Sequence, residues 1–297
     1  MKIAFVGASG YGNVGDDTYP LVFAQQLPEH ELVIYNSDLP RALPEDLDML
    51  VMGGGGILYN HGKEGDAAGL SPHFCCMRFY MDEAIRRRIP WGFLSCGFQF
   101  QFNGEENDAA RLKPWAPYLG QAHFVTLRSR RCVGIAQELC GREDVVFAPD
   151  AAYLYRPGAA ASQGDMRSIT LVPAGAVNAR NALTNHYLRQ FAGSGMSMTW
   201  LGMGAPADNH ALLAEAAERF PQAQIIASPG PRAAYETIAR SRLVITGRYH
   251  GMVFARACRV PFITPVDAPY KIRMENLDED ISAAATHFEV LRRHISG

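Results

Sequence analysis

Short apolar runs alternate with longer segments along the first half of this chain. Six runs of β-strand length lie at residues 2–6, 31–35, 49–52, 91–95, 123–127 and 145–147. Segments of helix length lie between several of them, at residues 16–27, 72–88 and 129–139. Strands that alternate with helices are typical of a parallel sheet covered by helices. The first half is therefore predicted to form an α/β domain.

The same pattern begins again beyond a small and polar stretch at residues 156–165, which is typical of a linker. Further strand-like runs lie at residues 169–172, 198–201, 224–227, 243–245 and 261–264. Segments of helix length lie at residues 181–191, 207–220, 232–239 and 251–258, and helical spacing returns in the tail from residue 274. We predict two Rossmann-like α/β domains facing a cleft, residues 1–157 and 158–297, with the C-terminal helix packing back toward the first.

The composition narrows the class of protein. Hydrophobic residues make up 48% of the 297 residues, which excludes an intrinsically disordered chain. The 28 basic and 30 acidic residues give a net charge of -2, so the chain has no global attraction for nucleic acid. No apolar run reaches the ~20 residues that cross a bilayer, and the N-terminus has no signal-peptide pattern. The six cysteines show no C-x-x-C spacing. We predict a cytoplasmic protein that uses no metal and no cofactor.

Glycines cluster in two regions of the chain, near the ends of predicted strands. In the first cluster, residues 10–15 satisfy the G-x-G-x-x-G pattern of dinucleotide-binding loops. Three interpretations stay open: a dinucleotide site, a tight turn with helix capping, and a polar loop that forms one wall of a substrate cleft. Asp16 and a second aspartate close the loop, and acidic residues in the first turn of a helix repel phosphate. We therefore favour the substrate cleft, with Gly12, Asn13 and Gly15 in its wall.

Four consecutive glycines, residues 53–56, follow the third predicted strand. Each costs about 1 kcal/mol of backbone entropy relative to alanine, so packing alone does not explain them. We predict that a ligand or the opposing domain approaches the backbone here, which places Gly54 and Gly55 in the substrate cleft. Asn60 and His61 follow in the same loop and are assigned to the cleft with them. A lone loop histidine is more often solvated, and this alternative stays open for His61.

The second cluster follows the predicted strand at residues 243–245 and has the sequence Thr246-Gly247-Arg248-Tyr249-His250-Gly251. It brings a cation, an imidazole and the start of a predicted helix to one strand end. An arginine donates two parallel hydrogen bonds to an anion, and the amides of a helix N-terminus add further donors. The motif therefore predicts a site for a small polyanion. The alternative is a structural turn with a hydrogen-bonded histidine.

Together these motifs resemble those of the polysaccharide pyruvyl transferases. The similar segments are Asn13-Val14-Gly15-Asp16, the glycines at 53–56, residues 127–129 through 148–151, Gly247-Arg248-Tyr249-His250-Gly251, Pro261 and Lys271. They follow the family's order across most of the chain, and the Arg–aromatic–His–Gly element is the most specific. The resemblance implies a fold like that of type B glycosyltransferases. It also implies an enzyme that transfers a pyruvyl group from phosphoenolpyruvate to a cell-surface polysaccharide or its precursor, forming a ketal and releasing phosphate.

The implied chemistry needs proton transfer and cations that hold the donor. The resemblance implies that Arg248 and His250 bind or activate phosphoenolpyruvate. We predict His250 and Asp16 as catalytic residues, although Asp16 could instead cap its helix. The predicted donor-binding residues are Arg248, Tyr249, Gly251 and Lys271. For the lysine, a solvated position on the surface is the alternative.

Other classes of function fit parts of the same pattern. A glycosyltransferase of type B architecture that uses a nucleotide-sugar is the main alternative, followed by a nicotinamide or flavin oxidoreductase and a non-catalytic binding protein. The expected partners are phosphoenolpyruvate and a sugar or glycan acceptor, without nucleic acid. The sequence leaves open whether the acceptor is lipid-linked and draws the protein to the inner face of the membrane, and whether the chain forms a homo-oligomer.

Overall fold

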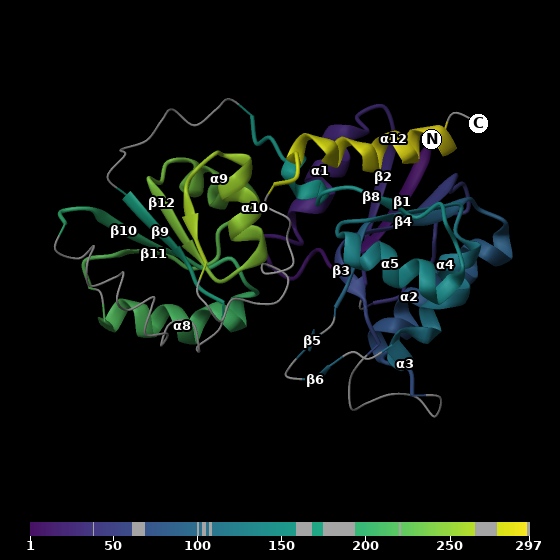
Figure 1. Cartoon of the computed structure of the whole chain (residues 1–297), viewed down its shortest axis with the longest axis horizontal. Coiled ribbons are helices and arrows are strands. Elements are labelled where there is room, and N and C mark those ends of the chain that lie inside the picture. Colours follow the sequence, from purple (N-terminus) through teal and green to yellow (C-terminus); the bar gives the residue numbers. More distant parts are fainter. Residues whose placement is uncertain are drawn as a thin grey trace. The chain divides into compact units, whose positions relative to one another are not determined.

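A computed structural model of the chain describes residues 1–37, 39–60, 69–99, 101–102, 105–106, 109–158, 168–174, 194–219, 221–264 and 278–295. They form two compact units, each built on its own parallel sheet (Figure 1). Unit 1 contains residues 1–10, 19–151 and 280–297, and unit 2 contains residues 11–18 and 152–279. The predicted α/β class, with one parallel sheet in each half of the chain, is confirmed.

Unit 1 is a layered α/β structure. Its main strands are β1 (Lys2–Gly7), β2 (Glu31–Asn36), β3 (Met49–Leu58), β4 (Trp91–Phe98), β7 (Phe124–Leu127) and β8 (Val146–Phe147). Its helices are α1 (Thr18–Gln26), α2 (Pro72–Arg87), α3 (Ala109–Leu112), η1 (Lys113–Trp115), α4 (Ala116–Gln121), α5 (Arg130–Cys140), η3 (Ile281–Ala285) and α12 (Thr286–Ile295). The strands pair in parallel in the order β2-β1-β3-β4-β7-β8. A short antiparallel pair, β5 (Gln101–Phe102) and β6 (Glu105–Glu106), precedes α3.

Different helices cover the two faces of the unit 1 sheet, because successive residues of a strand point to opposite faces. On β1, Phe5 stacks on Phe23 of α1 with ring centroids 4.1 Å apart, and Phe23 in turn contacts Phe288 of α12. Ala4 and Val6 of the same strand belong to a second core that includes α2. Helices α1 and α12 therefore lie on one face and α2 on the other (Figure 1).

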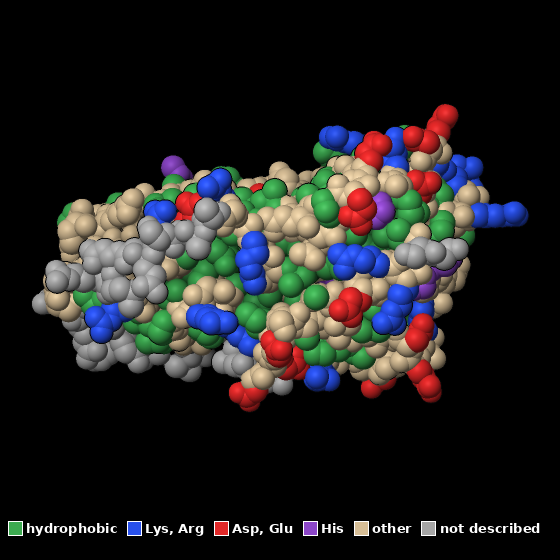
Figure 2. All heavy atoms as spheres, turned by 90° about the horizontal axis from the view of Figure 1, so that it is seen from above, with side chains coloured by type: hydrophobic (Ala, Val, Ile, Leu, Met, Phe, Trp, Pro, Cys, Tyr) green, Lys and Arg blue, Asp and Glu red, His purple; other side chains and the backbone are tan. Residues whose placement is uncertain are grey.

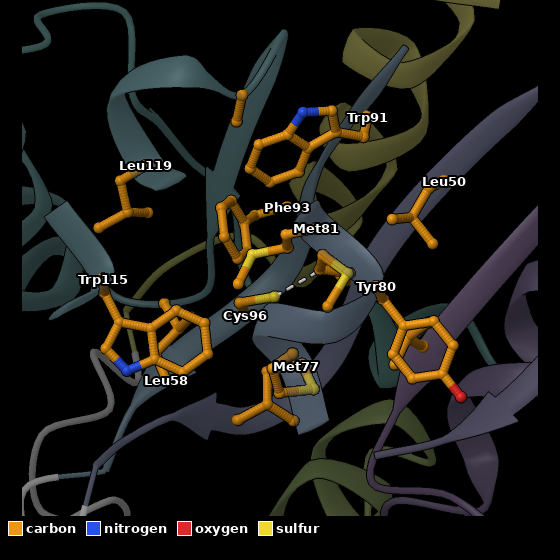
Figure 3. Packing of buried hydrophobic residues seen from close by; sticks show 14 of the residues in the cluster. Leu50, Leu58, Met77, Tyr80, Met81, Trp91, Phe93, Cys96, Trp115 and Leu119 are labelled. Carbon is orange, nitrogen blue, oxygen red and sulfur yellow. Dashed lines mark hydrogen bonds between the residues drawn. The ribbon is translucent and has the colours of Figure 1, made fainter. Parts of the chain in front are cut away.

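The second core of unit 1 lies between α2, β4 and the segment from η1 to α4 (Figure 3). Trp91, Phe93 and Trp115 are almost completely buried there. Burial of a side chain of this size contributes roughly 1.5–3 kcal/mol of stability. Cys96 donates from Sγ to the carbonyl of Met52 at 3.2 Å, and burial raises the pKa of its thiol to about 12. This core fixes β4 beside β3, so the carboxyl ends of these strands are held rigidly.

The glycine run differs from the prediction, because it belongs to a strand and not to a loop. Strand β3 was expected to end at Met52 but continues to Leu58. Gly54 and Gly55 have φ angles of +79° and +89°, and the pairing with β4 shifts register between Gly55 and Leu58. Glycine allows this irregular strand because the left-handed region excludes most other residues.

Unit 2, which consists of residues 11–18 and 152–279, contains a five-stranded parallel sheet. Its elements are η2 (Ala151–Leu154), β9 (Ser168–Val172), β10 (Ser197–Leu201), α8 (Pro206–Arg219), β11 (Gln224–Ile226), α9 (Pro231–Ala239), β12 (Leu243–Thr246), α10 (Tyr249–Ala257) and β13 (Phe262–Ile263). The strand order is β11-β10-β9-β12-β13, so the direction of winding reverses between β9 and β12. Leu213 of α8 packs on Ile169 and Trp200, whereas α9 and α10 lie on the opposite face (Figure 1). The predicted helix at 181–191 and residues 159–165 of the predicted linker lie outside the described residues.

The described surface mixes both signs of charge. In Figure 2, basic and acidic side chains are interspersed over unit 1, as expected for a chain with 28 basic and 30 acidic residues. Within the described part of the chain, no helix combines the length and the apolar character needed to cross a bilayer.

His287 attaches the C-terminal helix to the sheet of unit 1. Its side chain is completely buried, with Nδ1 2.7 Å from Thr126 Oγ1 and Nε2 2.9 Å from the Pro149 carbonyl. Burial lowers the pKa of this imidazole from 6.5 to about 4, although the nearby Asp150 carboxylate acts in the opposite direction. The imidazole of His287 is therefore neutral in the folded protein near pH 7.

We expect acid to destabilise unit 1 through His287. Below pH 6.5 the unfolded chain binds a proton at this residue, whereas the folded chain does so only near pH 4. The free energy of unfolding should therefore fall by about 3 kcal/mol between these two pH values, and no such contribution is expected above pH 6.5. Urea unfolding at several pH values measures this. His287→Gln should flatten the dependence, whereas the same change at the exposed His210 of α8 should leave it nearly intact; equal slopes in all three proteins would contradict the expectation.

Candidate active site

Arg248 lies at the point where the winding of the unit 2 sheet reverses. Ligands of open α/β sheets bind beyond the carboxyl ends of the strands at such a point. The guanidinium Nε of Arg248, which follows β12, donates to the carbonyl of Pro173, which follows β9, at 2.9 Å. The backbone N–H of Arg248 donates to Thr246 Oγ1 at 3.1 Å, and this hydroxyl donates to the Arg248 carbonyl at 2.9 Å. Backbone and side chain of the arginine are thus both held in place.

A glycine makes room for this arginine on its other side. Gly204 lies in the loop between β10 and α8, and a Cβ added to it would overlap the Nη1, Nη2 and Cζ atoms of Arg248. The guanidinium therefore packs flat against backbone, a contact that any larger residue at position 204 would prevent. This contact could not be predicted from the sequence, because Gly204 lies in no recognised motif.

His250 lies in the first turn of α10, which corrects the predicted start of this helix at residue 251. Arg248 is the extended N-cap residue, with φ of -105° and ψ of 139°, and the helix begins at Tyr249. Gly251 is therefore inside the helix, where it is needed for packing. A Cβ on Gly251 would overlap Thr246 Oγ1 and lie 3.1 Å from a methyl carbon of Val172. Tyr249 is buried, with only 9% of its surface exposed.

The first glycine loop packs with unit 2 and contacts His250. Residues 11–18 belong to unit 2, and the backbone N–H of Val14 donates to the carbonyl of Met203 at 3.1 Å. A Cβ on Gly15 would overlap the imidazole ring of His250, and one on Gly12 would lie 2.9 Å from Pro206 Cδ. Two glycines of the G-x-G-x-x-G pattern are therefore explained by close contacts within the protein, without a dinucleotide.

The side chains of this loop serve partly to shape it. Asn13 Oδ1 accepts from the Gly15 N–H at 3.2 Å, and the Asn13 carbonyl accepts from the Asp17 N–H at 2.8 Å. Asp16 is half-buried, and α1 begins only at Thr18, so Asp16 precedes the helix. Asp16 thus lies in a turn that Asn13 organises.

The other predicted cleft residues lie in unit 1. Gly54 is closely approached by the ring of Tyr19, which a Cβ at position 54 would overlap. The neighbour that requires glycine here is thus a side chain of the same unit, and the assignment of Gly54 and Gly55 to a substrate cleft stays a prediction. Asn60 is buried, and its Oδ1 accepts from the Ser71 N–H at 2.7 Å while its Nδ2 donates to the Gly69 carbonyl at 3.5 Å. His61 and Lys271 lie outside the described residues.

Sequence reasoning missed a buried ionic network at the carboxyl edge of the unit 1 sheet. Arg128 Nη1 donates to Asp150 Oδ2 at 2.8 Å and to the Tyr19 hydroxyl at 3.0 Å. The Tyr19 hydroxyl donates to Asp150 at 2.8 Å. Arg128 is 7% exposed and Asp150 is fully buried. Arg128 directly follows the predicted strand at 123–127, and Asp150 lies three residues after the one at 145–147; this position near two strand ends was the available signal. Within the described part of the chain, no group of three His, Cys, Asp or Glu side chains is arranged to hold a metal ion.

A family model now decides the relationship. Residues 22–267 match the model described as polysaccharide pyruvyl transferase. The chain belongs to the polysaccharide pyruvyl transferase family. The resemblance inferred from the motifs is thereby confirmed, and with it an enzyme of this kind, a transferase of polysaccharide biosynthesis. The matched range includes Arg248 and His250, whereas residues 11–18 and Lys271 lie beyond its ends.

Solved structures show the same fold at low sequence identity. The UDP complex of MnaA from S. aureus has a TM-score of 0.60 at 11% identity, over 98% of this chain and 87% of that one. A UDP-N-acetylglucosamine 2-epimerase from Listeria monocytogenes, described as putative, has a TM-score of 0.59 at 11% identity, over 99% of this chain and 88% of that one. The UDP-N-acetylglucosamine 2-epimerase from Rickettsia bellii has a TM-score of 0.58 at 8% identity, over 100% and 96%. The fold is therefore of the type B glycosyltransferase-like kind. A search of curated proteins found no match.

Proposed function

We propose that this enzyme forms a pyruvate ketal on a polysaccharide or its precursor, with phosphoenolpyruvate as the donor and phosphate as the second product. The family supplies the transfer of a pyruvyl group to a polysaccharide. The donor assignment rests on the position of Arg248. Its guanidinium is fixed by a hydrogen bond at the point where the winding of the unit 2 sheet reverses, and it lies beside the N-terminus of α10. Carboxylate and phosphate groups are the ligands that such a fork and such amides bind best.

The reaction balances with two hydroxyl groups of one sugar. Protonation of the methylene carbon of phosphoenolpyruvate makes its central carbon electrophilic, and the first hydroxyl oxygen attacks that carbon. Loss of phosphate with its electron pair makes the carbon electrophilic again, and the second hydroxyl closes the ketal. The two sugar hydroxyl groups lose two protons in total. One of these balances the proton added to the methylene carbon, and the other leaves with phosphate. The chain must therefore supply an acid, a base and a counterion for the donor.

We assign these tasks to residues of unit 2. Arg248 binds the donor carboxylate or phosphate through its Nη groups, and Lys271 adds a second cation for the phosphate. His250 transfers the proton to the methylene carbon, since imidazole titrates near neutral pH. Asp16 accepts a hydroxyl proton or binds the sugar. Gly15 allows the imidazole of His250 to lie directly against the loop that carries Asp16.

Release of phosphate tests the donor assignment. The purified protein is incubated with phosphoenolpyruvate and a panel of p-nitrophenyl glycosides of common hexoses and N-acetylhexosamines. We expect phosphate release that depends on one of these acceptors, together with a product heavier by the mass of the ketal. A parallel reaction with UDP-N-acetylglucosamine should give no product. UDP release from the nucleotide-sugar without any reaction of phosphoenolpyruvate would favour a glycosyltransferase instead.

Arg248→Ala should weaken the binding of phosphoenolpyruvate by about 2 kcal/mol, or roughly 30-fold, because a charge-assisted hydrogen-bond pair is lost. Isothermal titration calorimetry measures this without an acceptor. Arg242→Ala is the matched control, since Arg242 is exposed and immediately precedes β12, at the opposite end of the strand that leads to Arg248. Equal affinities of the Arg248→Ala variant and the wild type would place the donor site elsewhere.

A further inference from the structure

Asn209 of α8 binds the backbone on which Arg248 rests. Its Oδ1 accepts from the Gly204 N–H at 3.1 Å, and its Nδ2 donates to the Gly204 carbonyl at 2.6 Å. The same Nδ2 also donates to the carbonyl of Ala227, directly after β11, at 3.1 Å. The side chain is 1% exposed. One amide thus holds both polar groups of Gly204 and connects them to the end of the neighbouring strand.

The geometry of Gly204 depends on this amide more than on local backbone preference. A buried peptide group needs hydrogen-bond partners, and no regular element provides them in the loop between β10 and α8. Gly202 shows how tightly the loop is packed, because a Cβ there would overlap the Ala227 carbonyl oxygen and lie 3.0 Å from Asn209 Cγ. Asn209 therefore determines where Gly204 lies.

Gly204 in turn limits where the guanidinium of Arg248 can lie. A methyl group at Gly204 would overlap three atoms of the guanidinium, so the two groups are in direct contact. On its other side, Nε donates to the carbonyl of Pro173 at 2.9 Å. The arginine fork is confined between these two stretches of backbone. A shift of the Gly204 peptide would therefore change the direction in which the fork presents its Nη groups.

We propose that Asn209 is a positioning residue for the donor site and acts through Gly204 on Arg248. This inference rests on the proposed function, in which Arg248 binds the carboxylate or phosphate of phosphoenolpyruvate. A guanidinium that is fixed before the anion arrives loses little freedom on binding, which favours the bound state. Misplacement of a positioned group by about 1 Å can also slow a reaction by a factor of roughly 100. The amide of Asn209 supplies this fixed orientation without contacting the donor.

The test compares phosphoenolpyruvate binding by calorimetry in Asn209→Ala and the wild type. We expect the dissociation constant of Asn209→Ala to rise by about 10-fold, and by no more than the roughly 30-fold of Arg248→Ala, because Asn209 acts only through that arginine. The KM for phosphoenolpyruvate should rise with it while the KM for the acceptor stays constant. In an Arg248→Ala background, Asn209→Ala should cause no further loss of donor affinity. A general loss of stability would not produce this dependence on Arg248.

Two further variants keep the test decisive. Gly204→Ala should weaken donor binding similarly, because the added methyl displaces the guanidinium directly. This variant leaves the Asn209 amide in place, so it covers the case in which Asn209→Ala does not fold. Asn209→Asp keeps an acceptor for the Gly204 N–H but loses the donor to the carbonyls of Gly204 and Ala227. Ser241→Ala is the matched control: it removes a buried hydrogen-bonding group of unit 2, 2.6 Å from Thr170, and should leave donor affinity unchanged.

The possible failures are distinguishable. If the wild type does not bind phosphoenolpyruvate, the proposed function fails. If the wild type and Arg248→Ala differ but Asn209→Ala, Asn209→Asp and Gly204→Ala bind the donor as the wild type does, only the role of Asn209 is overturned. An equal additional loss in the Arg248→Ala background would also overturn it.

Discussion

His250→Gln should lower the turnover of phosphoenolpyruvate by at least 100-fold and leave donor binding largely intact. His250 lies in the first turn of α10, next to Arg248, and its ring packs against Gly15. Glutamine has a similar size and can form hydrogen bonds, but it does not titrate. General acid–base groups typically contribute a factor of about 100 to 10,000, so the loss should fall in this range. Phosphate release at saturating donor, combined with calorimetry of donor binding, measures both quantities.

Controls separate this loss from general damage. His210→Gln makes the same change at an exposed position of α8 in the same unit and should retain wild-type turnover. Gly15→Ala should also reduce turnover, because the new Cβ would overlap the imidazole of His250. A His250→Gln protein that keeps a tenth of wild-type turnover would exclude proton transfer by this residue, and His61 or Asp16 would then be the leading candidates.

The sheet was predictable from the sequence because buried parallel strands are apolar on both faces. The runs at 2–6 and 169–172 correspond to β1 (Lys2–Gly7) and β9 (Ser168–Val172) almost residue for residue. The prediction was wrong where this signal is absent. Gly53 to Gly56 have no side chains to reveal burial, yet they continue β3, because the backbone alone pairs with β4.

The functional motif was also found at the right place, since Arg248 follows an apolar run and precedes a helix. Its surroundings were not predictable. Gly204 and Asn209 are far from Arg248 in sequence and carry no charge, so only the folded chain shows that they support it. The loop at residues 11–18 was assigned to the first domain by its position in the chain. The hydrogen bond from Val14 to Met203 contributes to its packing with unit 2, and a long-range backbone contact of this kind leaves no trace in the sequence pattern.

The network of Arg128, Asp150 and Tyr19 could be predicted only in part from the sequence. Strands β7 and β8 pair in parallel, and the carboxyl ends of adjacent parallel strands meet at one edge of the sheet, so the residues after them are neighbours. The sequence does not show that the two charges pair with each other, nor that a tyrosine from α1 completes the pair. That depends on Gly54, which leaves space for the ring of Tyr19, and on Gly97, whose added Cβ would lie 2.8 Å from Arg128 Nε.

Arg128→Met should destabilise unit 1 by about 3–5 kcal/mol, because it removes the guanidinium that pairs with the fully buried Asp150 carboxylate. Methionine preserves most of the volume, so the loss reports the charge and not a cavity. The midpoint and slope of urea unfolding give the free energy. Arg86→Met is the matched control, since the Arg86–Glu83 pair has an N–O distance of 2.6 Å but an arginine side chain that is 70% exposed. Exposed pairs contribute about 0–1 kcal/mol, and the control should lose no more than that.

The double variant Arg128→Met/Asp150→Asn decides whether the pair itself is responsible. Removal of both charges eliminates the uncompensated carboxylate, and the amide can still accept a hydrogen bond from the Tyr19 hydroxyl. We therefore expect the double variant to be more stable than Arg128→Met alone, since replacing both partners of a buried pair is often close to neutral. If the double variant instead loses the sum of the two single losses, the charges do not interact, and the stability of this edge must come from the packing of Tyr19 against Gly54.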